Sequence, residues 1–432
     1  MSEKKSLSTF FFIPELRNRI LTTFFFILIF RIGTFVTLPG INIDKLNTNT
    51  GGLLGLLDVF LGGAFSNKSI FSLGIMPYIN ASIVIQLLTL AVPKFQKLQR
   101  EGQGGRAKIR KITKLLTLGI AVFQSFAFVS YNVPSDILLI DKATFVFLSM
   151  FILTAGTMTC VWIGNRITDE GIGNGISVLI MVGIISSLPG AILDEFYMDK
   201  SGNLLYLLIK ILLLGAVLMF AVWVNNAVRK ISLLYAKEFK YTRDNYTYRR
   251  QYLPLKLIGV GVMPIIFAQV IMFLISFCFG KFADRAAWVM DINNSLSDYT
   301  SWGHNITFAV LIIMFTYLYT AVNMNPVQIA DDLKKADGFI PGIKPGNDTA
   351  DFIDKILNYL TFWGALILAF VAVLPAAASS LGFGQHFSRF FGGTSLLIIV
   401  SVGIEMIQQI KSYVLLHHYD HIMDFSDFFD EN

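Results

Sequence analysis

The sequence predicts an all-α polytopic membrane protein. Of its 432 residues, 54% are hydrophobic and only 15% are charged, which excludes an ordinary soluble domain of this length. Because the hydrocarbon core offers no water to backbone groups, each spanning segment is expected to be a helix. Ten apolar runs are long enough to be spans: residues 20–38, 69–92, 114–131, 143–163, 172–190, 204–228, 256–278, 305–325, 357–378 and 394–414.

The basic residues predict the orientation of these spans. With the N-terminus in the cytosol, the six inner segments and the basic residues adjoining them carry 26 Lys and Arg, whereas the outer segments carry 7. Positive charge concentrates on the cytosolic side of membrane proteins. Both termini are therefore expected in the cytosol, as an N-terminal segment at 1–19 and a tail at 415–432. No cleavable signal peptide is evident, so the first span is expected to be retained.

Ten spans divide into two sets of five. Because five is odd, two structurally similar halves would have opposite orientations in the membrane, which tends to place a transport pathway at the interface between them. The N-terminal half is expected at 20–190 and the C-terminal half at 191–414, with cytosolic loops at 229–255 and 326–356. No internal sequence repeat supports this division, which rests on the number of spans.

Between the first two spans lies a short apolar segment, GGLLGLLDVFLGGAF. Its apolar part, 53–65, would be about 20 Å long as a helix, too short for a core of about 30 Å. It is bracketed by Gly51, Gly52, Gly62 and Gly63. The segment is either an interfacial or re-entrant helix, or a movable half-helix that fills a cavity from the outer side.

The second span has a mixed face that does not suit lipid. At 100° per residue, Ile75, Ile79, Ser82 and Gln86 fall close together on one side. That face is apolar first and polar towards the cytosolic end, as expected for a surface that lines a protein cavity.

The sequence indicates no enzyme. The glycines in NRITDEGIGNGIS link two spans rather than a strand and a helix, so they favour a tight cytosolic turn over a phosphate loop. Cys160 and Cys278 lie in apolar runs and are expected to be packing residues. The histidines of the tail sequence HHYDH are typical of a solvated tail rather than of a dedicated metal site. We expect no catalytic group, no metal site and no cofactor.

Six motifs taken together resemble one family. SIFSLGIMPYINASIVIQLLT, EGQGGRAKIRKITK, WIGNRITDEGIGNGIS, YLPLKLIGVGVMPIIFA, GIKPGNDTADFIDK and FGGTSLLIIV are similar to the bacterial SecY family, the channel subunits of the Sec protein translocase. The resemblance runs in order from about Asn18 to Ile410. It implies ten transmembrane helices in two inverted five-helix halves around a central, hourglass-shaped pore.

The resemblance also implies a closed pore and the residues that close it. A short plug helix at 53–65 would fill the pore from outside, and a ring of isoleucines would form the constriction. The ring residues would be Ile75, Ile79, Ile180, Ile266 and Ile398. The plug residues would include Leu53, Leu54, Leu57, Phe60 and Phe65.

A lateral gate towards lipid is implied as well, with Asn80, Gln86 and Gln124 as its polar residues. Cytosolic partners would dock at Lys344, between the Pro-Gly pairs at 341–342 and 345–346, and at Arg243, Arg249 and Arg250. The family usually has arginine where this chain has Lys344. Lysine keeps the charge and loses the bidentate hydrogen bonding.

The resemblance implies the central channel subunit of the Sec translocon in the bacterial cytoplasmic (inner) membrane. Unfolded secretory proteins would cross it, and hydrophobic segments of membrane proteins would leave sideways into the lipid bilayer. The implied partners are SecE-like and SecG-like subunits, a SecA-like motor ATPase and the ribosome. The alternative is an inverted-repeat secondary transporter of a small solute, which needs ionisable groups at mid-membrane. The charges within spans are Arg31, Lys210 and Glu405, with no cluster of carboxylates.

Overall fold

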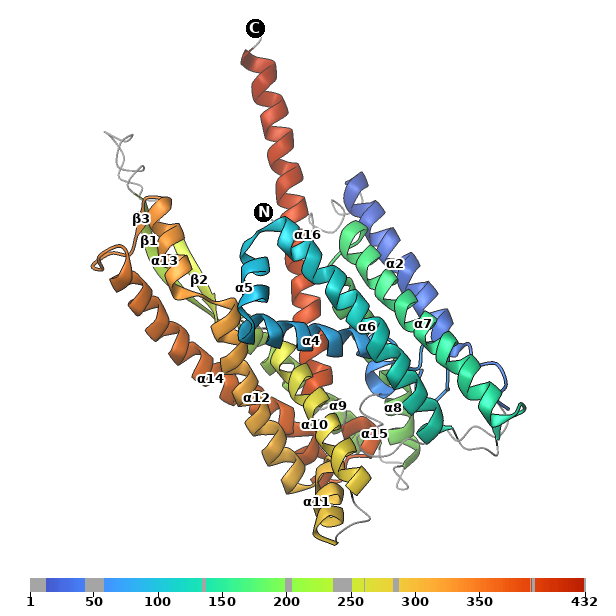
Figure 1. Cartoon of the computed structure of the whole chain (residues 1–432). Coiled ribbons are helices and arrows are strands. Elements are labelled where there is room, and N and C mark those ends of the chain that lie inside the picture. Colours follow the sequence, from blue (N-terminus) through green and yellow to red (C-terminus); the bar gives the residue numbers. More distant parts are fainter. Residues whose placement is uncertain are drawn as a thin grey trace. The chain divides into compact units, whose positions relative to one another are not determined.

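The computed structural model of the chain describes residues 13–42, 58–133, 137–198, 204–235, 251–259, 261–282, 287–388, 390 and 393–430. These residues are mostly helical (Figure 1) and belong to two compact units. The first unit comprises residues 1–194 and 401–432, and the second comprises residues 195–400.

The first unit is a set of packed helices. Its elements are α2 (Pro14–Phe35), α4 (Met76–Ala91), α5 (Pro93–Arg100), α6 (Gln103–Asn132), α7 (Lys142–Glu170), α8 (Gly175–Met198) up to Asp194, and α16 (Gly393–Asp430) from Ser401 onward. Helix α6 packs against both α4 and α7, and α2 packs along α7 (Figure 1).

The second unit contains helices and a small sheet. Its elements are the end of α8, α9 (Leu204–Asn225), β1 (Val228–Tyr235), β2 (Gln251–Lys256), α10 (Met263–Phe282), α11 (Ala287–Ser297), α12 (Trp302–Asn323), α13 (Pro326–Lys335), β3 (Gly338–Phe339), α14 (Asn347–Ser380), α15 (Gln385–Ser388) and the first part of α16. Helix α12 packs against α10 and α14 (Figure 1).

The helices confirm a multi-pass membrane protein. In the described part of the chain, eight helices are long and apolar enough to cross a membrane. Helices α4 and α5 pass the same test together with a bend of 103° between them, and Met263–Ser276 is a shorter apolar helix. These segments are consistent with ten spans. Large apolar side chains such as Leu115, Met219 and Trp223 are exposed, as expected for surfaces that face lipid.

The segments between α9 and α14 include a three-stranded sheet, formed by β1, β2 and β3. The apolar runs in the sequence do not predict this sheet. Strand β1 pairs antiparallel with β2, placing Val228 opposite Lys256, and also with β3. The requirement that lipid-exposed segments be helical does not apply here, because the strands belong to the connections between apolar helices.

Helix α4 begins at Met76, whereas the apolar run begins at 69. The residues before it form turns because two serine hydroxyls bond a backbone carbonyl: Ser69 and Ser72 both donate to the Ala64 oxygen, at 3.2 and 2.9 Å. Gly74 then adopts a left-handed conformation with φ +47°. Hydropathy does not detect these local bonds, so it placed the start of the helix too early.

The glycine-rich connection between α7 and α8 is a tight turn, as predicted. Gly173 has φ +82°, and the Gly175 amide donates to the Thr168 hydroxyl at 2.9 Å. The Ile172 amide donates to Thr23 of α2 at 3.0 Å, and the Gly173 amide donates to Gln409 of α16. A Cβ at Gly175 would lie 1.9 Å from the Gly164 oxygen, so this close crossing of α7 and α8 requires glycine.

Candidate functional site

The isoleucines predicted to form the ring lie near the beginnings of four helices. Ile75 directly precedes α4, Ile79 and Ile266 are the fourth residues of α4 and α10, and Ile180 and Ile398 are the sixth residues of α8 and α16. Ile75, Ile180 and Ile398 are buried, and the other two are half-buried. Ile75, Ile79 and Ile180 belong to the first unit, whereas Ile266 and Ile398 belong to the second. A ring would need residues from both units, so it stays a prediction.

The segment predicted as a plug is described from Asp58 onward, and Leu53, Leu54 and Leu57 lie outside the described residues. Residues 58–60 are helical, and Gly62 and Gly63 follow with φ +63° and +85°. The Gly63 amide donates to the backbone carbonyl of Asp58 at 3.0 Å, which closes the turn. The glycine pair therefore ends the helical segment, as the left-handed conformation does at many helix C-termini.

Residues 64–72, called the plug root below, are fixed firmly within the first unit. Ala64 and Phe65 of the root, and Leu61 of the turn before it, belong to a buried apolar cluster with Phe128 of α6 and Leu153 of α7, among others. The Phe65 and Phe128 rings meet edge to face with centroids 4.9 Å apart. This burial and the serine bonds to Ala64 hold the root in one position.

Lys68 is a buried base in the plug root that sequence reasoning counted only as an outer charge. Its side chain donates to the Phe65 carbonyl at 3.4 Å and lies 5.3 and 5.9 Å from the Phe65 and Phe128 ring centroids. Burial lowers the pKa of Lys68, and the negative charge of Asp58 partly opposes that shift. Asp58 itself accepts hydrogen bonds from the Ser66 amide and hydroxyl.

The polar residues predicted for a lateral gate share an unusual property. The side-chain oxygens of Asn80 and Gln86 on α4 and of Gln124 on α6 are buried, and none has a hydrogen-bond partner among the described residues. An unpaired buried amide group is destabilising by about 1–3 kcal/mol. Helices α4 and α6, which pack together, thus carry buried polar groups that would gain hydrogen bonds in a wetter environment.

The predicted cytosolic docking loops share one apolar cluster in the second unit. Ile231 and Leu233 of β1 and Leu255 of β2 pack with Ile340 and with Ile353 of α14. Strand β1 and the connection after α13 are therefore parts of one folded element. Arg243, Arg249 and Arg250 lie outside the described residues.

Lys344 lies at an exposed turn of this element. Gly342 and Gly346 have φ +82° and +112°, so both Pro-Gly pairs form turns that need glycine. The Lys344 carbonyl accepts a hydrogen bond from the Thr349 hydroxyl at 2.8 Å, while its side chain is exposed. The backbone of the loop is fixed and the cation is free to meet a partner of opposite charge.

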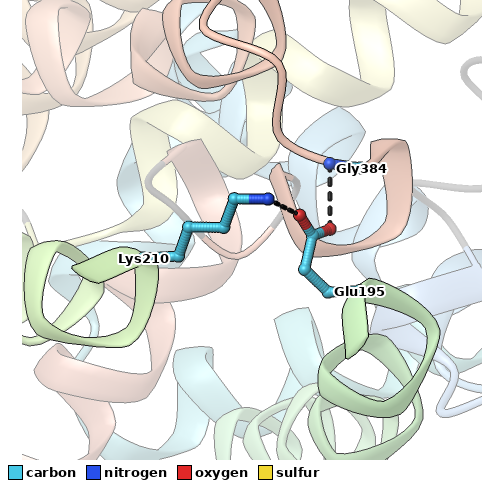
Figure 2. Close-up of polar contacts among 3 residues, drawn as sticks. All are labelled: Glu195, Lys210 and Gly384. Carbon is cyan, nitrogen blue, oxygen red and sulfur yellow. Dashed lines mark hydrogen bonds and ion pairs between the residues drawn. The ribbon is translucent and has the colours of Figure 1, made fainter. Parts of the chain in front are cut away.

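Two of the three charges within spans are engaged by neighbouring groups. Figure 2 shows Lys210 of α9 paired with Glu195 near the end of α8. Both side chains are only 3% exposed. The second oxygen of Glu195 accepts from the Gly384 amide at 2.9 Å. Arg31 of α2 donates to the Gly62 carbonyl at 3.1 Å. Glu405 is exposed.

Cys160 is buried in α7, as expected of a packing residue, and its thiol is free. The side chain of Cys278 lies outside the described part of α10. No group of His, Cys, Asp and Glu able to hold a metal ion occurs among the described residues.

Comparison with known proteins identifies the family. The SecY family model matches residues 69–407, most of the chain. The protein translocase subunit SecY of Streptomyces scabiei is 38% identical over 426 residues, which cover 94% of this chain and 97% of that relative. This chain belongs to the SecY family. The SecY subunit of Staphylococcus aureus strain NCTC 8325 / PS 47 is likewise 38% identical, over 428 residues, covering 96% of this chain and 98% of the relative.

Solved structures show that the SecY fold extends along this chain. A structure described as a protein conducting channel gives a TM-score of 0.67 at 16% identity, with 92% of each chain covered. A second, in which the SecY plug domain is described as stabilising the closed channel and maintaining a membrane seal, gives 0.64 at 17% identity with the same coverage. Sec61 in the canine ribosome–channel complex gives 0.61 at 17% identity, again covering 92% of each chain.

Sequence reasoning missed several residues that shape the SecY-family site in this chain. Ser66, Ser69 and Ser72 recur every third position directly before α4, and this spacing could have indicated a hydrogen-bonded turn. Glu195 gave no such signal, because nothing near it in the sequence indicates that its partners are Lys210 and Gly384.

Proposed function

We propose that this chain is the central channel subunit of a Sec translocon and passes unfolded polypeptides across a bacterial cytoplasmic membrane. The observation that carries the proposal is the 38% identity to protein translocase subunits over nearly the full length of both chains. A family member of this kind is a channel rather than a catalyst. The energy for transport would come from a partner or from the membrane potential.

The geometry of the first unit supports a plugged channel. The apolar segment 53–65 follows α2 and ends in a buried root beside α6 and α7. A plug needs such a fixed root, because a short apolar segment that closes a pore has to return to the same place after each opening. The ring of Ile75, Ile79, Ile180, Ile266 and Ile398 would form the constriction, where branched apolar side chains exclude ions by dewetting.

The buried amides support a lateral gate between the second and third spans and the seventh and eighth. Asn80, Gln86 and Gln124 would gain hydrogen bonds when water or a polypeptide backbone reaches them, which lowers the free energy of opening. Hydrophobic segments would then pass into lipid.

The shared cluster under β1, β2 and the Lys344 loop supports a single docking platform on the cytosolic side, where Arg243, Arg249 and Arg250 would also contribute. A SecA-like motor or a ribosome would dock there, and SecE-like and SecG-like subunits would complete the channel. Both termini would lie in the cytosol. A solute transporter is not favoured, because Arg31 and Lys210 are engaged within the chain rather than grouped around a binding site.

A crosslinking experiment tests the proposal. A photoreactive amino acid at Ile79 should crosslink to a secretory chain stalled during transport, and the same group at Ile209 should not. Ile209 lies on α9 with half of its surface exposed, as expected for contact with lipid. Equal yields at both positions, or none at Ile79, would contradict a pathway past Ile79.

A further inference from the structure

The turn that precedes the plug root, residues 58–61, is called the plug tip below. Val59 and Leu61 of the tip are buried, Leu61 lies in the same apolar cluster as the root, and the Asp58 carboxylate accepts hydrogen bonds from Ser66 of the root. Hydrogen bonds are directional, so a bond to the turn from another helix adds a defined orientation to these contacts. Among the described residues, Arg31 of α2 makes this bond: its guanidinium donates to the Gly62 carbonyl of the turn at 58–63, at 3.1 Å.

The position of this bond suits a guanidinium. A backbone carbonyl oxygen carries partial negative charge, and a hydrogen bond from a charged donor to it is stronger than one from a neutral donor. Arg31 has no carboxylate partner in the part of the chain that the structure describes. Its guanidinium lies 5.1 Å from the ring centroid of Phe35 on its own helix. When the bond to Gly62 breaks, the ring still stabilises the cation.

Helix α8 forms the opposite side of the same contact. A Cβ added at Gly183 would lie 2.3 Å from the Phe60 oxygen, and one added at Gly62 would lie 2.6 Å from the Arg31 nitrogen and 3.0 Å from the Gly183 Cα. A real Cβ essentially never lies 2.3 Å from a backbone oxygen, so Phe60 of the plug tip approaches α8 this closely only because residue 183 is glycine. Gly62 and Gly63 also supply backbone freedom at the junction between tip and root.

We propose that Arg31 and Gly183 set the resting position of the plug. Arg31 acts as a releasable latch by its hydrogen bond to the Gly62 carbonyl, and the absence of a side chain at Gly183 lets the plug tip pack directly against α8. The tip leaves by rotation at Gly62 and Gly63 while the root stays buried; this movement withdraws Leu61 from the apolar cluster and breaks the hydrogen bonds between Asp58 and Ser66. The inference rests on the proposed channel function. Arg31 is a positioning residue, because it acts through the plug and touches no substrate.

The first test compares Arg31→Met in two backgrounds, using the full chain assembled with its partner subunits in a planar bilayer. In the otherwise unchanged channel we expect ion leak per assembled channel to rise about tenfold, equal to about 1.4 kcal/mol in the closed-to-open ratio. In a channel lacking 53–61, the same substitution should add no further leak, because there is no tip to hold. Arg31→Lys should leak less than Arg31→Met, since it keeps the cation and loses only the planar donor geometry.

The second test uses glycines of one helix. Gly183→Ala should raise leak with Arg31 intact, because the new methyl group displaces the Phe60 carbonyl. Gly190→Ala is the matched control, since a Cβ there meets no atom within 4 Å. It should leave leak unchanged.

The outcomes separate the latch from the channel function. If deletion of 53–61 leaks and neither Arg31→Met nor Gly183→Ala does, the latch is wrong and the plug stands. If Arg31→Met leaks as strongly with the tip deleted, Arg31 acts elsewhere and the latch is wrong. If the deletion itself does not leak, the plug function fails first.

Discussion

The buried ion pair between Lys210 and Glu195 allows a quantitative prediction. Each side chain is only 3% exposed. Among the described residues, the Glu195 carboxylate also accepts from the Gly384 amide at 2.9 Å (Figure 2). Lys210→Met leaves that carboxylate buried and hydrogen-bonded to the neutral Gly384 N–H without the neighbouring cation. Removal of one partner from a buried pair destabilises by about 3–5 kcal/mol, because the remaining charge is uncompensated. Glu195→Gln should destabilise by a smaller amount, because the amide oxygen can still accept from Lys210 while the negative charge opposite the ammonium group is lost.

The double variant gives the decisive result. Replacing both residues by Met and Gln removes both charges and keeps similar volumes, so its stability should exceed that of either single variant. Stability is measured as the midpoint of unfolding in mixed detergent micelles of increasing denaturing-detergent fraction. Lys335→Met is the matched control: its pair with Asp332 belongs to the same unit but is 79% and 62% exposed, so the change should stay within about 1 kcal/mol.

Two results would refute this reasoning. Single variants with midpoints equal to that of Lys335→Met would show that burial of the pair is energetically unimportant. A double variant no more stable than the weaker single variant would show that the two side chains act independently, each through other contacts.

Three further predictions concern transport. Deletion of 53–61, which spares the plug root, should raise the ion conductance of reconstituted channels; an unchanged conductance contradicts a sealing role. Lys344→Glu reverses the charge of a fixed, projecting loop and should slow motor- or ribosome-coupled translocation at equal levels of assembled complex, whereas the exposed Lys334→Glu should have a smaller effect. The paired change of Ile79 and Ile266 to Asn should wet the constriction, increase leak and relax the demand for a strongly hydrophobic signal sequence, and the paired change to Leu should be much milder. Equal leak from the Asn and Leu pairs in assembled channels would mean that these residues do not line the constriction.

The sequence was most informative where one property repeats along a continuous segment. The apolar runs indicated the membrane helices because burial in lipid demands both apolar side chains and internal backbone hydrogen bonds. The Pro-Gly pairs around Lys344 indicated turns because proline and glycine restrict the backbone locally. The start of α4 and the strands β1 and β2 were not anticipated, because serine hydroxyls and strand pairing act on the backbone without changing mean hydropathy.

The sequence by itself therefore determined the class of protein, the membrane helices, the turns and the family resemblance. Only the tertiary structure decided which charged and small residues meet. Arg31 bonds a carbonyl 31 residues away, and Glu195 bonds an amide 189 residues away. Local patterns fix the backbone of each segment, but a side chain's partner depends on how segments distant in sequence pack. For that reason Arg31 and Lys210 were recognised from the sequence as charges within spans, while their partners at Gly62 and Glu195 became visible only in the folded chain.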